Sequence, residues 1–349
     1  MKLLLTVLLL FTQFLTPTLA QAKPFQHLEE ALRYYEKIEK TRGWPVVDKG
    51  PKLEKGLSDP RVSQLRQQLL LTKDLEEKES KDPDFFDENL EKAVQLFQKR
   101  HGLTEDGIVG VTTLQALNIP IETRIRQIEA SIQREKESQP LPEGQYILIN
   151  IPAFHLDYFE NKKSVLGMAI IVGRRNWKTP TFSSNITGIT FNPTWNIPAS
   201  IVKREILSKI KKDPDYLAKE EIEVAENRYW QKPGPKNPLG RIKFVMPNEF
   251  DVYLHDTPAK NFFTRPMRSL SHGCVRIDKP LELAEFLLRA DPRWTLKKIQ
   301  QTIDEGKEIT IPLPAPVPVN LIYQTVWLDE AGLLQFRTDI YGRDESENK

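Results

Sequence analysis

The sequence contains a single cysteine, Cys274, among 349 residues, so no disulfide can form within the chain. Its 50 Lys and Arg residues nearly balance its 48 Asp and Glu residues, and it has no basic stripe with interleaved aromatic residues. This composition argues against a nucleic-acid partner. The sequence also lacks the Gly-x-x-x-x-Gly-Lys-Ser/Thr and Gly-x-Gly-x-x-Gly motifs, which excludes the nucleotide-binding loops that depend on them.

Long apolar runs are equally scarce, because the only strong one extends from Leu3 to Leu15. Small residues follow it, so residues 1–22 are predicted to be a secretory signal peptide cut after Ala20 or Ala22. An uncleaved anchor is the alternative, although the run is short for a membrane span. We therefore expect an exported, periplasmic chain with no membrane span after signal removal.

The spacing of apolar residues in the remaining chain is typical of helices in the first part and of strands in the second. Helical spacing predicts an N-terminal segment (23–58), a three-helix module (59–118) and a connecting helix with a linker (119–144). Residues 145–315 show short, turn-bounded strands and one substantial helix, which is typical of a β-sandwich or barrel-like domain. Residues 316–349 are predicted to be a hairpin and tail. The predicted fold class is therefore multidomain α+β.

The alternating pattern of the strands is interrupted at residues 200–236. These residues combine a helical pattern, an acidic run and an exit rich in Pro and Gly. Both a solvated surface excursion and a mobile lid over a cleft fit this composition.

The single cysteine lies in the Ser-His-Gly-Cys stretch of residues 271–274, and His255 precedes that stretch by fifteen intervening residues. A free cysteine usually behaves as a small buried hydrophobe. Its polar neighbours here, including Arg276, are a poor setting for an inert thiol. A lone Cys with a His elsewhere in the chain is a candidate nucleophile and base.

Three local features are expected to activate this thiol. The charge of Arg276 or of a protonated histidine would lower the pKa of Cys274. A helix predicted over Lys279–Arg289, with Asp278 as its cap, would add the field of its dipole. Gly273 is expected to offer an unhindered backbone N–H to an oxyanion.

The spacing of His255 and Ser271-His272-Gly273-Cys274 resembles the signature of the L,D-transpeptidase family. The family pattern often has Asn two residues after the Cys, where this chain has Arg276. The resemblance covers most of residues 145–315 and implies a mainly β catalytic domain that needs no cofactor. Residues 93–110 resemble the three-helix peptidoglycan-binding domain, which would give residues 59–118 a glycan-binding role. A helical spacer without a ligand is the alternative.

The resemblance implies a reaction on peptidoglycan stem peptides. Cys274 would attack the carbonyl that precedes the terminal D-Ala of a tetrapeptide donor, with His255 as proton acceptor and donor. Backbone N–H groups near Gly273 and Cys274 would stabilise the oxyanion. D-Ala would leave, and an amine of a neighbouring stem would attack the thioester to form a 3→3 cross-link. The family also implies that carbapenems acylate such cysteines.

Other residues are expected to support this site. The resemblance implies that the backbone carbonyl of Asp256 orients the His255 ring, while His272 shapes the loop rather than acting as the base. Ser271 and Arg276 belong to the same supporting set. The candidate substrate contacts are Tyr253, Trp195 and Arg268.

Several alternatives remain open at this stage. A zinc site of His255, His272 and Cys274 is disfavoured because zinc ligands usually occur in closer pairs, so no metal is expected. The same thioester could pass to water, as in an L,D-carboxypeptidase, or to the Lys of a lipoprotein. Cysteine endopeptidases of peptidoglycan place the Cys before the His, unlike this chain. An inactive wall-binding scaffold is the remaining alternative.

Overall fold

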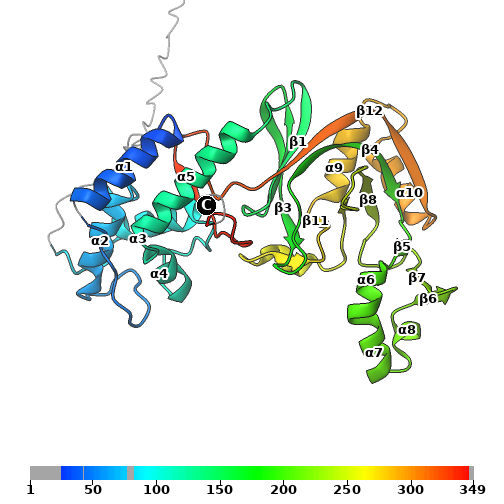
Figure 1. The fold of residues 1–349 in the computed structure, drawn as a ribbon, viewed down its shortest axis with the longest axis horizontal. Coiled ribbons are helices and arrows are strands. Elements are labelled where there is room, and N and C mark those ends of the chain that lie inside the picture. The colour runs from blue at the N-terminus through cyan, green and yellow to red at the C-terminus, as the bar shows by residue number, and fades with distance from the viewer. Residues whose placement is uncertain (1–24, 42, 77–81, 346–349) are drawn as a thin grey trace, which may run out of the picture.

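The computed structural model describes residues 25–41, 43–76 and 82–345, and the predicted signal peptide lies outside them. Figure 1 shows helices gathered at one end of the molecule, a β-sheet unit beside them and a small projection beyond the sheet. The helices at the first end are α1 (Leu28–Thr41), α2 (Arg61–Leu71), α3 (Glu88–Arg100), α4 (Val111–Leu117) and α5 (Ile121–Glu137).

Helices α2, α3 and α4 surround one apolar core. The α3 helix begins where the side chain of Asp87 accepts a hydrogen bond from the Leu90 N–H, which satisfies a donor that the helix leaves unpaired. Leu90, Val94 and Phe97 recur at helical spacing and are buried against α2. This core is separate from that of the sheet, so the three helices form a compact module of their own.

The two ends of the chain share a second core. The strands β13 (Val326–Leu328) and β14 (Leu334–Phe336) pair as a hairpin, and their apolar side chains pack against α1 and α5. Arg100 of α3 forms a buried ion pair with Asp74 and donates to the carbonyl of Leu334 in the hairpin. The C-terminal hairpin therefore completes the packing of the N-terminal helices.

The sheet of the second unit closes on itself. It has nine strands, and β2 pairs with both β1 and β3. Pairings then run from β3 through β11, β9, β8, β4 and β12 back to β1, as in a barrel. The strands are β1 (Gln145–Asn150), β2 (His155–Glu160), β3 (Lys163–Gly173), β4 (Phe182–Phe191), β8 (Ile242–Val245), β9 (Leu254–His255), β10 (Ser269–Ser271), β11 (Val275–Ile277) and β12 (Ile309–Ile322).

The core of the barrel follows from the two-residue period of its strands. Ile147 and Ile149 of β1, for example, are fully buried. The helices α9 (Pro280–Leu288) and α10 (Leu296–Asp304) add Leu283, Ile299 and other apolar residues to the same core. The prediction of one substantial helix was therefore incomplete, because α10 also contributes to this core.

The proline-rich run of residues 312–318 lies inside the sheet rather than at the start of a separate tail. Strand β12 pairs with β4 on one side and with β1 on the other. Its register shifts between Pro312 and Val317, where prolines cannot donate ladder hydrogen bonds. The buried side chains Leu313, Val317 and Val319 keep the two-residue period through this irregularity.

Residues 195–231 form the projection beyond the sheet in Figure 1. Its small core combines Ile197, Ile201, Ile206 and Ile222. Its elements are β5 (Trp195–Asn196), α6 (Ala199–Ile201), the π-helical turn η1 (Val202–Ile206), α7 (Leu207–Lys212), α8 (Tyr216–Lys219), β6 (Ile222–Ala225) and β7 (Arg228–Gln231).

The predicted fold class is confirmed: a helical region that includes the peptidoglycan-binding-like module precedes a mainly β domain. Within the described part of the chain, no helix combines the length and apolar character needed to cross a membrane.

Candidate active site

Three adjacent strands bring the polar residues of the site together. In the registers of β8, β9 and β11, Lys243 pairs with His255, and His255 pairs with Arg276. Directly paired residues extend from the same face of a sheet, so these three side chains form one row. The alternate residues of the strands, such as Leu254 and Val275, are fully buried in the core on the opposite face. The two-residue period thus separates the site from the core.

The His255 ring is buried and neutral. It is only 4% exposed, and its Nδ1 lies 2.5 Å from the backbone oxygen of Asp256, as the family resemblance implies. Because a carbonyl only accepts, Nδ1 carries the proton of the neutral ring. Burial lowers the pKa of His255 to about 3, and the charges of Arg276 and Lys243 act in the same direction.

The expectation of a lowered thiol pKa was wrong. Burial raises the pKa of Cys274, although hydrogen bonds to Tyr253 and the charges of Lys243 and Arg276 offset part of this effect. The predicted helix dipole does not act directly, because strand β11 separates Cys274 from α9. The resting site therefore contains a neutral thiol and a neutral imidazole.

The predicted cap of α9 was also wrong. The residue at its N-cap is Lys279, which makes no side-chain capping bond. Asp278 instead donates its backbone N–H to the oxygen of Ala169 in β3. The chain is still extended at Asp278 because β11 has just paired with β3.

We call residues 271–274, which contain the candidate nucleophile Cys274, the nucleophile loop. Hydrogen bonds of Ser271 stabilise its conformation. The Ser271 hydroxyl donates to the Cys274 carbonyl at 2.6 Å and accepts the Gly273 N–H at 3.1 Å. The Gly273 N–H is thus already bonded and is not the free donor that the sequence suggested. Gly273 has a φ of 117°, a conformation that favours glycine. Along the described chain, the backbone N–H groups of His272 and Cys274 have no hydrogen-bond partner.

His272 points toward the projection formed by residues 195–231, which we also call the insert. Its Nε2 lies 2.6 Å from the carboxylate of Glu205 in η1, and Arg174 contacts both side chains. The ring of Trp177 meets His272 edge-on, with 5.1 Å between ring centroids. The sequence did not indicate Glu205 or Arg174, because neither lies in a motif and the contact spans distant segments.

The structure places the three candidate substrate contacts in different surroundings. Tyr253 lies beside the site, with its ring 5.6 Å from that of His255. Burial raises the pKa of Tyr253, and its interaction with Cys274 acts in the same direction. Trp195 belongs to the insert, where it packs against that segment's own core. Arg268 donates to the backbone oxygens of Phe154 and Ile170 and thereby supports β3. Tyr253 alone of the three is therefore shown to interact with Cys274.

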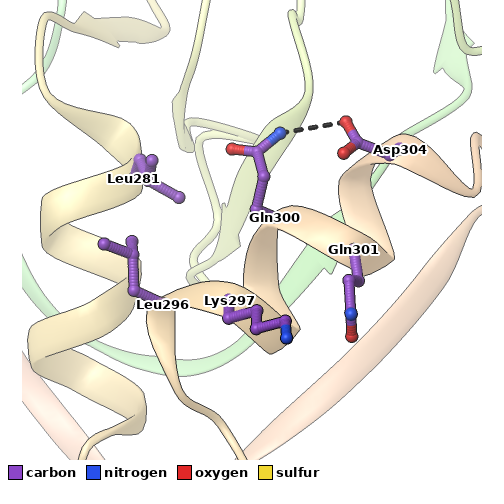
Figure 2. Close-up of a pocket in the computed structure, with 6 residues that line it drawn as sticks. All are labelled: Leu281, Leu296, Lys297, Gln300, Gln301 and Asp304. Carbon is purple, nitrogen blue, oxygen red and sulfur yellow. Dashed lines mark hydrogen bonds between the residues drawn. The ribbon is translucent and has the colours of Figure 1, made fainter.

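A pocket elsewhere on the surface lies away from these residues. Figure 2 shows a pocket between α9 and α10 whose polar lining includes the hydrogen-bonded pair Gln300 and Asp304. It contains none of the predicted site residues. Among the residues that the structure describes, no group of three or more His, Cys, Asp or Glu side chains is arranged to hold a metal ion.

Comparisons with known proteins give matches to two domain families. Residues 144–310 match the family described as "L,D-transpeptidase catalytic domain", and residues 58–117 match the one described as "Putative peptidoglycan binding domain". The chain is 32% identical over 222 residues to a Haemophilus influenzae protein named "Putative L,D-transpeptidase". That match covers 58% of this chain and 45% of the relative, so this chain spans less than half of the relative's length.

Solved structures of L,D-transpeptidases are also similar to this chain. The one from Xylanimonas cellulosilytica is 15% identical, with a TM-score of 0.27 over 79% of this chain and 99% of that chain. The one from Stackebrandtia nassauensis is 16% identical, with a TM-score of 0.30 over 80% of this chain and 96% of that chain. From the family matches, the chain carries a catalytic domain of the L,D-transpeptidase family, preceded by a domain of the peptidoglycan-binding family.

Proposed function

We propose that this protein is an L,D-transpeptidase that forms 3→3 cross-links in peptidoglycan through a thioester on Cys274. The observation that carries the proposal is the pairing of β9 with β11, which positions a neutral His255 in a polar row beside the Cys274 loop. The family match supports the reaction class. The peptidoglycan-binding module supports the substrate.

The chemistry begins with a proton transfer. As Cys274 Sγ attacks the carbonyl carbon before the terminal D-Ala, His255 Nε2 accepts the thiol proton. The unpartnered N–H groups of Cys274 and His272 are the donors available to the oxyanion. The carbon–nitrogen bond then breaks, and His255 returns the proton to the amine of the departing D-Ala. A thioester remains on Cys274.

The second half of the reaction reverses these roles. The amine of a neighbouring stem attacks the thioester carbon, and His255 accepts the proton that this amine loses. The carbon–sulfur bond breaks, and the sulfur regains its proton as a thiol. The raised pKa of Cys274 favours the thiol in the resting enzyme, while Lys243 and Arg276 stabilise sulfur as it gains negative charge.

The acceptor defines the alternative functions. Water would make the protein an L,D-carboxypeptidase, and a lipoprotein Lys would make it an anchoring enzyme. A non-catalytic wall-binding scaffold would need neither Cys274 nor His255. The peptidoglycan-acting family indicates an envelope location, and we propose the periplasm, with residues 59–118 holding the enzyme on the wall during cell-wall biogenesis and the maintenance of cell shape.

Replacing the nucleophile tests this proposal directly. The wild-type protein should form one covalent carbapenem adduct per chain, because a β-lactam presents a strained amide to the thiol. Cys274→Ala should form none. Its thermal unfolding midpoint should change little, since the change removes one sulfur from a loop rather than a core side chain. Intact-mass spectrometry detects the adduct, and an unaltered adduct on the variant would refute the assignment.

The two histidines should differ in their effects on acylation. His255→Ala should slow carbapenem acylation by about a hundredfold to ten-thousandfold, since it removes the proton acceptor. His272→Ala, which removes the contacts with Glu205, Arg174 and Trp177 but not the proton acceptor, should have the smaller effect. Stopped-flow acylation kinetics of both variants would measure the difference. A larger loss in His272→Ala would reverse the assignment of the base.

The pH profile provides an independent check on His255. A histidine with a lowered folded pKa stays neutral until the pH falls toward that pKa. The wild-type acylation rate should therefore remain level down to about pH 5, instead of falling near the ordinary histidine pKa of about 6.5. A half-maximal rate near that ordinary value would show that His255 titrates normally.

We further propose that residues 200–236 act as a lid. The π-helical turn η1 carries Glu205 to the nucleophile loop, and π-helical turns often occur at functional sites. Hydrogen exchange of these amides should slow when a carbapenem occupies Cys274, because the acyl group would give the insert a second surface to contact. Protection that is high and unaffected by acylation would indicate a static excursion.

A further inference from the structure

The segment after the hairpin returns to the active site. Tyr341 lies beyond the region matched by the catalytic-domain family, yet its side chain is buried in the barrel core. Its hydroxyl donates to the carbonyl of Gly173 at 2.6 Å and accepts the N–H of Thr179 at 3.1 Å. One side chain of the tail thus joins the end of β3 to the loop that follows it.

Thr179 continues this connection to the nucleophile loop. Its side chain is fully buried, and its hydroxyl accepts the Gly173 N–H at 2.9 Å and donates to the Gly273 carbonyl at 2.7 Å. A hydroxyl has one proton, so the Gly273 carbonyl is its only possible recipient here. We call the two hydroxyls of Tyr341 and Thr179 the hydroxyl bridge.

Close packing leaves this bridge little freedom. A Cβ atom on Gly173 would lie 1.9 Å from the Trp177 oxygen, so the two backbones touch. Lys178 donates to the Tyr341 carbonyl at 3.2 Å, and Arg343 donates to the Thr181 hydroxyl at 3.3 Å. The tail therefore contacts residues 178–181 at three points, and a shift of the tail would displace Thr179.

The position of the tail is fixed from the other side of the molecule. The Tyr323 hydroxyl accepts the Tyr341 N–H at 2.8 Å and donates to Asp339 at 2.6 Å. Asp344 forms a buried ion pair with Arg134 of α5 at 2.8 Å. The helical end of the molecule and the nucleophile loop are thus connected through one continuous set of polar contacts.

Peptide geometry explains what this connection does at the site. The carbonyl of Gly273 and the N–H of Cys274 belong to one planar trans peptide and point in opposite directions. Holding the carbonyl against Thr179 therefore directs the Cys274 N–H away from Thr179, where it remains unpartnered. Gly273 itself permits many backbone conformations, so an external contact is needed to select one.

We propose that Tyr341 and Thr179 are positioning residues, which orient the Gly273–Cys274 peptide so that its N–H meets the oxyanion. The inference rests on the proposed acyl transfer by Cys274 and extends the working site to a tail outside the matched catalytic domain. Such residues should matter for acylation, which builds an oxyanion, but not for simple alkylation of the thiol, which does not.

Paired reactions of the full chain test this distinction. Thr179→Val keeps the shape of the side chain without its hydroxyl, Thr179→Ser keeps the hydroxyl, and Tyr341→Phe removes the other half of the bridge. Tyr158→Phe is the matched control, because its buried hydroxyl has no partner among the described residues. Each variant is treated with a carbapenem and, separately, with iodoacetamide, while thermal unfolding is recorded.

Thr179→Val and Tyr341→Phe should slow acylation by about tenfold to a hundredfold, the scale expected for a small misalignment. Their alkylation rates should stay within about twofold of wild type, because the thiol itself is untouched. Thr179→Ser and Tyr158→Phe should acylate at nearly the wild-type rate. Tyr341→Phe keeps the ring that packs in the core, so the test does not depend on Thr179→Val remaining fully folded.

Three results would overturn the inference. The first is wild-type acylation in both Thr179→Val and Tyr341→Phe. The second is an equal loss of acylation and alkylation, and the third is a loss of acylation that Thr179→Ser shares. The second and third would each indicate general disruption of the loop. A wild-type protein that alkylates but never acylates would instead refute the proposed function, and the inference with it.

Discussion

The pairing of β9 with β11 is the constraint on which the site depends. It places His255 beside Arg276, and β8 adds Lys243 to the same row. The opposite face of these strands is buried in the barrel, so a slip of one residue would expose the core and bury the charges. The hydrophobic core thus fixes the register, and the register fixes which polar groups lie near Cys274.

Burial then determines how the site works. It raises the pKa of the Cys274 thiol and lowers that of His255. Both groups are therefore neutral near pH 7, and the proposed reaction moves a proton during attack rather than starting from an ion pair. Positive charges on Lys243 and Arg276 are already in place for the sulfur anion, so little reorganisation is needed as it forms.

The sequence predicted the parts of this arrangement that are local. The spacing of His255 and Cys274 and the alternation of the strands are both visible along the chain itself. Glu205, Thr179 and Tyr341 could not be found this way, because each acts across a long separation in the chain. The direction of the Cys274 pKa shift was missed for a related reason, since burial is a property of the assembled fold.

The central claim is that Cys274 transfers a stem acyl group to an amine. Mass spectrometry of muropeptides, after incubation of the full chain with purified tetrapeptide stems, tests it most directly. The account predicts a 3→3 cross-linked dimer with the release of one D-Ala per cross-link. Tripeptide without dimer would identify water as the acceptor and contradict the cross-linking function. Unchanged tetrapeptide, from folded protein with an alkylatable thiol, would contradict acyl transfer altogether.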